Sequence, residues 1–356
     1  MDLDWNTAAT QGPPKDIIAI SADGVSSAAV RWHEALVAAC SVGELLAVKS
    51  LLAALPATSG AEHGTAPAVG PAVEQSAPFR AACREGHINV VRFLLSLRGE
   101  LSVDPTALQC EAFREACARG HTEVVRELLA LEGERAINVN VREQCVLQHA
   151  CLGGHVGVLR LLLALDGERR MQPAVSNYAC FRLACSAGKL GVVRELLALT
   201  GDRRIEVNAA NGVAFDQACE NGHIHVVREL LAITGEQEVV PQRGLRSACA
   251  NGHAHVVQEL LAITGRRQVD PLIQNATALY AACSAGHLGV LHELLALTGE
   301  RQVPLGGGGP FPLKVACRFG HLRLVQELFA LPPGRLNRRA DSYQEAFCDA
   351  CQHGHE

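Results

Sequence analysis

Apolar residues recur along this chain with a spacing of three and four residues, which predicts pairs of short helices. Phe113, Ala116 and Cys117 lie at positions i, i+3 and i+4, which is one face of a short helix. Gly120 follows them and supplies the backbone freedom that ends a helix. A second apolar stripe then begins, with the width of one buried helix face: Val124, Val125, Leu128, Leu129 and Leu131. Gly133 is expected to end this second helix.

The two-helix unit recurs along the chain. Its loop glycines are 34 residues apart, except for one interval of 30 residues between Gly222 and Gly252. The aligned glycines are Gly86, Gly120, Gly154, Gly188, Gly222, Gly252, Gly286, Gly320 and Gly354. Helices this short are marginal alone, so neighbouring units must stack to bury their apolar faces. The sequence therefore predicts an all-α, helix-turn-helix repeat solenoid of about nine and a half units.

The register of the unit resembles that of the ankyrin repeat from Ala35 to the end of the chain, with Cys in place of the second Ala. The resemblance implies an ankyrin-type solenoid that binds a partner protein through its concave groove and inter-repeat loops. The Thr-Pro-Leu-His opening of the family is absent, as Glu111-Ala-Phe-Arg114 shows. The first helix must therefore begin with different capping. The projecting finger after the second helix is also longer, as in residues 200–208.

The two ends of the array depart from the regular pattern. Residues 1–30 show no periodicity and are expected to be a flexible N-terminal tail, so that the array occupies residues 31–356. Residues 56–78 are rich in Ala, Pro and Gly and are expected to be a flexible insertion after a degenerate first repeat. The tenth repeat is incomplete at the C-terminus. We expect this end to be frayed, covered by a partner or produced by truncation.

The charge of the chain narrows the class of partner. A formal charge of −5 and a pI near 6.3 give no drive toward nucleic acid or an anionic membrane. Residues 1–11 lack the features of a signal peptide, and charged residues interrupt every long apolar run. These features predict a cytoplasmic or nuclear protein that is monomeric by itself. Its partner is expected to be another protein, and delivery into a host cell remains open.

Cysteine and histidine recur at fixed positions of the unit. Ten cysteines occupy one position of the first helix: Cys40, Cys83, Cys117, Cys151, Cys185, Cys219, Cys249, Cys283, Cys317 and Cys351. Packed helix axes are about 8 to 10 Å apart, whereas a disulfide needs Cα atoms within about 6.8 Å. The cysteines are therefore predicted to be small buried hydrophobes in a reducing compartment. The ankyrin resemblance implies that the histidines after the loop glycines organise the loop by hydrogen bonding.

One cluster leaves a metal site open as an alternative. Cys348, Cys351, His353 and His355 lie within eight residues, which would allow a zinc site. Cys351 and His355 are ordinary repeat positions, however, so the preferred prediction is that the chain holds no metal and no cofactor.

Two sets of residues are candidates for partner binding. The first varies in chemistry just after the apolar residue of each first helix: Arg80, Arg114, Gln148, Arg182, Asp216, Arg246, Tyr280 and Lys314. The second follows the glycine after each second helix: Arg135, Arg169, Arg170, Arg203, Arg204, Arg266, Arg267 and Arg301. The simpler interpretation of the second set is that it complements helix dipoles and pairs with nearby acidic residues. The alternative is that it binds a partner with an acidic surface.

The sequence contains no signature of a catalytic site or a nucleotide-binding loop. It therefore predicts a non-catalytic scaffold or adaptor that has no catalytic residues and binds another protein. The alternative is that the array is the targeting arm of a larger enzyme whose catalytic part lies beyond residue 356.

Overall fold

The computed structural model is an array of paired α-helices, which confirms the predicted ankyrin-type helical repeat solenoid. It describes residues 25–54, 73–140, 145–303, 305, 312–332, 335, 346, 348 and 350–354. The chain divides into two compact units, Met1–Gln172 and Pro173–Glu356. Each unit is described by itself.

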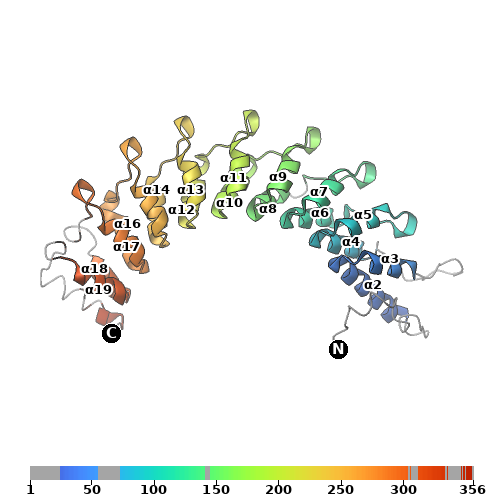
Figure 1. Ribbon diagram of the computed structural model, residues 1–356, viewed down its shortest axis with the longest axis horizontal. Helices are drawn as coiled ribbons and strands as arrows, with labels where there is room; N and C mark the ends of the chain where they lie inside the picture. The colour runs from blue at the N-terminus through green and yellow to red at the C-terminus, as the bar shows by residue number, and fades with distance from the viewer. Residues whose placement is uncertain are drawn as a thin grey trace. The chain divides into compact units, whose positions relative to one another are not determined.

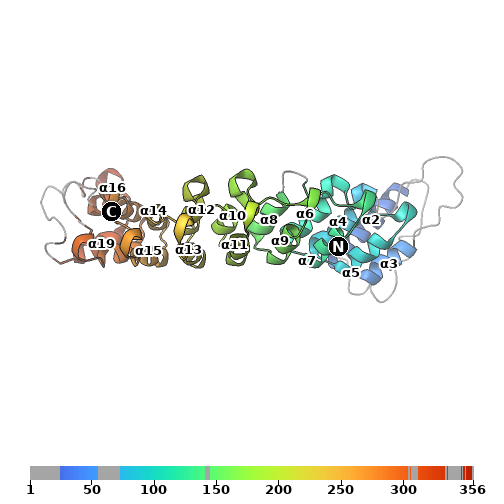
Figure 2. The same ribbon diagram turned by 90° about the horizontal axis from the view of Figure 1, so that it is seen from above.

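In the first unit, the helices form two rows, as Figures 1 and 2 show. First helices stack on first helices, and each contacts the second helix of its own repeat. The helices are α2 (Val25–Val42), α3 (Leu45–Ala53), α4 (Val73–Glu85), α5 (Ile88–Ser96), α6 (Ala107–Arg119), α7 (Thr122–Leu129), α8 (Cys145–Gly153) and α9 (Val156–Leu163). Single 3-10 turns lie in the projecting fingers: η2 (Gly99–Leu101), η3 (Gly133–Arg135) and η4 (Gly167–Arg169).

The second unit has the same two-row arrangement. Its helices are α10 (Val175–Ser186), α11 (Leu190–Leu197), α12 (Ala209–Glu220), α13 (Ile224–Leu231), α14 (Gln242–Ala250), α15 (Ala254–Leu261), α16 (Ile273–Ala285), α17 (Leu288–Leu295), α18 (Pro312–Arg318) and α19 (Leu322–Ala330). Its finger turns are η5 (Gly201–Arg203), η6 (Gly235–Gln237), η7 (Gly265–Arg267) and η8 (Gly299–Arg301).

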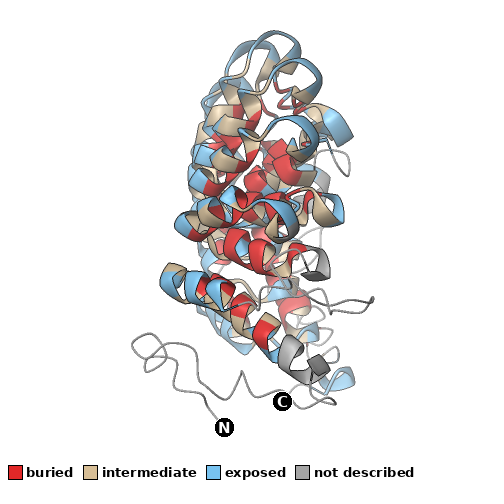
Figure 3. Cartoon of the chain, turned by 90° about the vertical axis from the view of Figure 1, so that its right-hand side faces the viewer, coloured by how far each residue is buried: buried red, intermediate tan, exposed pale blue. Residues whose placement is uncertain are grey.

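The core is built from the repeated positions that the pattern predicts. Phe113, Ala116 and Cys117 are fully buried, and most of the equivalent residues in the other repeats are also buried. Figure 3 shows buried residues along the helices of the array. The cysteines of the described residues are free thiols, and most of those at the repeat position lie in this core. Cys317 and Cys351 depart from the prediction, because Cys317 is half-buried and Cys351 is exposed.

The loop between the two helices joins each repeat to the one before it. Gly120 adopts a left-handed conformation, with φ of 80°, and its amide caps α6 at the carbonyls of Ala116 and Cys117. The histidine after the loop glycine is expected to form a hydrogen bond that organises the loop. It forms a hydrogen bond, and the partner lies in the preceding repeat. His287 Nε2 donates to the carbonyl oxygen of Ala250 at 3.0 Å. The repeated histidines therefore bond neighbouring repeats together.

The fingers begin earlier than the sequence pattern predicts. Gly133 does not end the second helix, because α7 ends at Leu129 and the chain then becomes extended at Glu132. Gly133 instead opens the turn η3, with φ of 64°. This turn places the arginine that follows against the preceding repeat: Arg135 donates to the carbonyl oxygen of Leu95 at 3.1 Å.

The same contact recurs in other fingers of both units. The guanidinium donates to a leucine carbonyl at the end of the preceding second helix in four further pairs: Arg169 to Leu129, Arg267 to Leu231, Arg301 to Leu261 and Arg335 to Leu295. These side chains are half-buried. Part of the arginine set therefore caps helix ends by direct hydrogen bonds, which agrees with its simpler interpretation.

We expect Arg301→Ala to lower the free energy of unfolding by about 1.5 to 3 kcal/mol, because hydrogen bonds from a charged donor are lost. Arg301 donates to the carbonyl oxygens of Leu261 at 2.9 Å and Val269 at 3.2 Å. The matched control is Arg204→Ala, since the exposed Arg204 side chain has no partner among the described residues. Urea unfolding followed by circular dichroism measures both variants. Equal losses would contradict the capping role.

Several of the first helices begin with an unusual backbone. Leu108, Gln109 and Cys110 have φ between 51° and 58°, so they form one left-handed turn before α6 becomes regular. Ser176 to Tyr178 and Ala210 to Gly212 form the same turn at the equivalent positions of their repeats. Each non-glycine residue in this conformation costs about 1 to 2 kcal/mol, which tertiary contacts must offset. This turn replaces the missing Thr-Pro-Leu-His opening.

Two of the predicted domain boundaries need correction. Helix α2 begins at Val25, so the last part of the predicted N-terminal tail is helical. Helix α4 begins at Val73, so residues 73–78 of the predicted insertion belong to a helix. The pattern missed both, because these helix starts do not carry the regular apolar spacing. The rest of the insertion, residues 56–72, lies outside the described residues, as do residues 1–24.

Candidate binding groove at the short repeat

The 30-residue interval marks a missing segment at the start of α14. Pro241 is four positions from the first-helix apolar residue Leu245, whereas the equivalent Pro173 is eight positions from Phe181. The missing residues belong to the part of the repeat that forms the left-handed turn in α10 and α12. Consequently α14 begins directly after Pro241 without such a turn.

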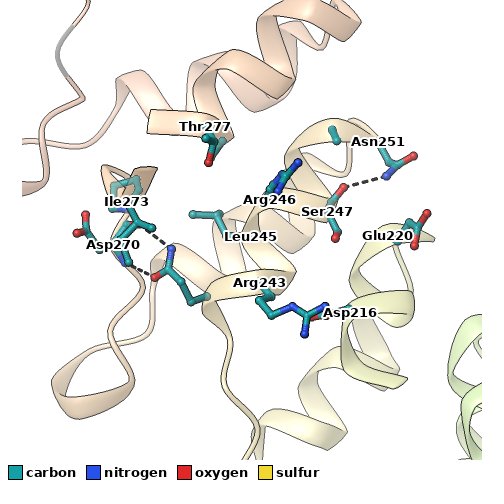
Figure 4. Close-up of a pocket in the computed structure, with 14 residues that line it drawn as sticks. Asp216, Glu220, Arg243, Leu245, Arg246, Ser247, Asn251, Asp270, Ile273 and Thr277 are labelled. Atoms are coloured by element: carbon teal, nitrogen blue, oxygen red, sulfur yellow. Dashed lines mark hydrogen bonds and ion pairs between the residues drawn. The ribbon is translucent and has the colours of Figure 1, made fainter. Parts of the chain in front are cut away.

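A groove occupies the space beside this shortened helix (Figure 4). We call it the short-repeat groove, and its volume is about 540 Å³. It is lined by residues of α12, α14 and α16 and of the chain before α16: Asp216, Glu220, Gln242, Arg243, Leu245, Arg246, Ser247, Ala250, Asn251, Asp270, Pro271, Ile273, Thr277 and Ala278. All of these residues lie in the second unit.

One wall of the groove holds an internal ion pair. Arg243 lies 3.0 Å from a carboxylate oxygen of Asp216 and also donates to the carbonyl oxygen of Asn211. Burial raises the pKa of Asp216 above its ordinary value, and the guanidinium of Arg243 opposes that shift. The charges of Asp216 and Arg243 are therefore largely satisfied within the groove wall.

The end of the groove nearest the finger is held by reciprocal hydrogen bonds. The side chain of Gln242 donates to the carbonyl oxygen of Asp270 at 2.8 Å and accepts from the Asp270 amide at 2.8 Å. The carboxylate of Asp270 accepts from the amide of Leu272. These bonds connect α14 with the chain before α16, so this end is preorganised.

Other side chains in and beside the groove are exposed to solvent. The exposed side chains of Arg246 and Glu220 form no hydrogen bond or ion pair with the described residues. Ile273 is 43% exposed on the groove wall, and Tyr280 is 41% exposed further along α16. Thr277 and Tyr280 are spaced at i and i+3 and share one helix face. The groove therefore combines an apolar wall with a free cation and a free anion.

The structure brings together three of the predicted binding residues. Asp216 and Arg246 line the short-repeat groove, and Tyr280 lies on the helix that forms its apolar wall. Two others instead contact the left-handed turns: Arg114 donates to the carbonyl of Gln109, and Arg182 to that of Ser176. These two guanidiniums are partly occupied by contacts within their own repeats.

The remaining candidates lie away from the groove lining. Arg266 pairs with Glu238, which also contacts Arg267 at 2.9 Å. Arg204 is exposed. The half-buried candidates in this group are Arg170, Arg203, Arg267 and Lys314. Their role in partner binding stays a prediction.

Sequence reasoning missed several groove residues, among them Glu220, Arg243, Ile273 and Thr277. The signal that could have found them was the 30-residue interval, since a shortened first helix leaves its neighbours without a contact. The pattern places one residue per repeat at the exposed position, however. It does not say which neighbouring side chains a deletion uncovers.

The described residues offer little support for two other kinds of site. No group of three or more potential metal ligands occurs among them. His355, one member of the proposed zinc cluster, lies outside them. Within the same part of the chain, no helix is both long and apolar enough to cross a bilayer.

The stacked helix pairs, with a repeated core and chemically varied exposed positions, define a helical repeat solenoid. The chain matches the family description "Ankyrin repeats (3 copies)" over residues 81–172, 215–303 and 245–340, and it belongs to the ankyrin repeat family. Proteins of this family generally mediate protein–protein interaction and are typically non-catalytic. A search of curated proteins finds no match.

Proposed function

We propose that this protein is a non-catalytic scaffold or adaptor that binds a partner protein at the short-repeat groove. The observation that carries the proposal is the groove itself, which coincides with the shortened interval in the repeat. Arg246 in the groove and Tyr280 beside it are exposed, and both belong to the residue types that dominate protein interfaces. The alternative that the array is the targeting arm of a larger enzyme stays a prediction.

The volume of the groove supports a segment of a partner as its occupant. About 540 Å³ lies within the range of pockets that hold small ligands or a few side chains. The lining of the groove extends from α12 across α14 to α16, which suits an extended chain (Figure 4). The hydrogen-bonded frame around Gln242 limits the cost of ordering this surface on binding.

We expect that restoring the missing length will abolish binding. The variant inserts Ala-Val-Ser-Asn, the sequence of residues 174–177, after Pro241 and so allows a left-handed turn to fill the groove. The probe is a random peptide library displayed on phage, selected on the full chain. Selected peptides should bind the insertion variant at least tenfold more weakly than the unaltered chain. Tyr280→Ala should weaken their binding by a similar factor, as expected when a hot-spot residue is lost. A factor of ten corresponds to about 1.4 kcal/mol of binding free energy.

The matched control carries the same four residues between Glu236 and Gln237, at the tip of a finger. It adds the same length without filling the groove, so it should retain binding. Circular dichroism and urea midpoints establish that both variants fold. Peptides that bind the groove insertion as well as the unaltered chain would disprove this function.

A further inference from the structure

The free charges along the short-repeat groove are arranged in a defined order. Asp216, Arg246 and Tyr280 occupy equivalent positions of three successive repeats, so they lie at one level along the first helices. Glu220 is four residues after Asp216, which places it about 6 Å nearer the loop end. Ile273 is seven residues before Tyr280 on α16 and lies nearer the finger end. Figure 4 shows Arg246 between Ile273 and Glu220.

Only part of the charge in the groove is available to a partner. Asp216 is paired with Arg243, and the carboxylate of Asp270 accepts a backbone amide. A cation at Arg246 and an anion at Glu220 remain, next to an apolar wall at Ile273. A guanidinium favours a carboxylate, which it binds with two parallel hydrogen bonds. The complementary ligand is thus apolar at the finger end, acidic in the middle and basic at the loop end.

The spacing of these groups matches an extended peptide. An extended chain advances about 3.3 Å per residue. Ile273 is on α16, Arg246 on α14 and Glu220 on α12, and packed helix axes are about 8 to 10 Å apart. Side chains of an extended chain alternate between its two faces, so residues an even number of positions apart share a face. Four residues span about 13 Å, which allows for the distance between neighbouring helices and an offset along them. Side chains four positions apart could therefore reach all three groups at once.

We propose that the short-repeat groove recognises an extended peptide segment with an apolar, an acidic and a basic residue in that order, each about four residues after the one before. The acidic residue binds Arg246, the basic residue binds Glu220, and the apolar residue packs on Ile273. This inference rests on the proposed function and specifies the chemistry of its partner. It also narrows the earlier prediction of an acidic partner surface, because the ligand carries both signs of charge.

The test uses synthetic peptides and the full chain. The matching peptide has leucine, glutamate and lysine at its first, fifth and ninth positions in a background of alanine, glycine and serine. The comparison peptide exchanges the glutamate and the lysine, and both are also made in the reverse chain direction. Fluorescence anisotropy gives the dissociation constants. We expect one direction of the matching peptide to bind about tenfold more tightly than its exchanged form, since like charges would then meet.

Charge exchange in the protein provides the decisive comparison. Arg246→Glu combined with Glu220→Lys should reverse the preference, so that the exchanged peptide becomes the tighter ligand. Both residues are exposed, and an unchanged urea midpoint would confirm that the variant folds. The preference should weaken as salt is raised, because exposed charges are screened.

The outcomes separate this inference from the proposed function. Library peptides that need an open groove but lack the charge order would overturn the inference and leave the function standing. Loss of all groove-dependent binding would overturn both. A dimer that forms in sedimentation experiments and disappears on insertion after Pro241 would assign the groove to a second copy of the chain and also overturn the inference.

Discussion

Raising the pH from 7 to 10 is expected to unfold much of this array, because its core contains a series of buried thiols. Burial raises the pKa of Cys40, Cys249 and Cys283 to about 12. Four further thiols have their pKa raised above the ordinary value by the same cause: Cys83, Cys117, Cys185 and Cys219. In the unfolded chain these thiols titrate near their ordinary value, about 8.5.

The sign of the effect follows from proton linkage. Above about pH 8.5 the unfolded chain releases protons that the folded chain retains, so the free energy of unfolding falls as pH rises. The stability is fully present below the unfolded pKa and is lost progressively up to the folded pKa, near 12 for Cys40, Cys249 and Cys283. Each thiol contributes a loss of about 2 kcal/mol at pH 10. Summed over the series, the loss is comparable to the stability of a whole domain, about 5 to 15 kcal/mol.

Urea midpoints measured with reductant from pH 7 to 10.5 test this prediction. The control variant combines Cys219→Ala, Cys249→Ala and Cys283→Ala. It should be less stable than the parent at pH 7, because atoms are removed from the core. Its midpoint should fall less steeply with pH, since three titrating groups are absent. Parallel curves for the two proteins would show that other groups cause the alkaline loss.

Gly252→Ala is expected to have the second large effect, through a clash between neighbouring repeats. Gly252 has φ of +80°, and a Cβ at this position would lie 2.6 Å from Nδ1 of His287. The ring cannot move away without losing its hydrogen bond to the carbonyl of Ala250. We expect a loss of about 1 to 2 kcal/mol from the left-handed backbone and a further 1 to 3 kcal/mol from the hydrogen bond.

A glycine in a finger provides a matched control for the free-energy cost of the left-handed backbone. Gly265 has φ of +76°, and a Cβ there would have no atom within 4 Å. Gly265→Ala should therefore cost only about 1 to 2 kcal/mol. Adding His287→Ala to Gly252→Ala should cost less than His287→Ala alone, since the clash is already relieved. Equal urea midpoints for Gly252→Ala and Gly265→Ala would argue against a role for the histidine contact.

The helix pairs and their core could be read from the sequence because the signals that specify them are local. The spacing of Phe113, Ala116 and Cys117 describes one face of one helix, and repetition makes the pattern unmistakable. The irregular starts of α2 and α4 were missed, because neither carries that spacing. The left-handed turn at Leu108 was also missed, since nothing in the residue types there requires a positive φ.

The candidate site was only partly predictable for a related reason. Asp216, Arg246 and Tyr280 were found because they share a repeat position, but Glu220 and Ile273 do not. Likewise, the arginines after the finger glycines could be noticed in the sequence. Their hydrogen bonds to carbonyls of the preceding repeat required the structure, as Arg267 and Leu231 show.

The sequence by itself determined the repeat, its period, the identity of the core and the place where the period fails. Those properties depend on spacing within about 34 residues, over which the chain carries its own signals. Only the tertiary structure decided which charges are paired, which remain free and where a groove opens. Those properties depend on three repeats meeting at α14, and the distances among their side chains arise only when the helices stack.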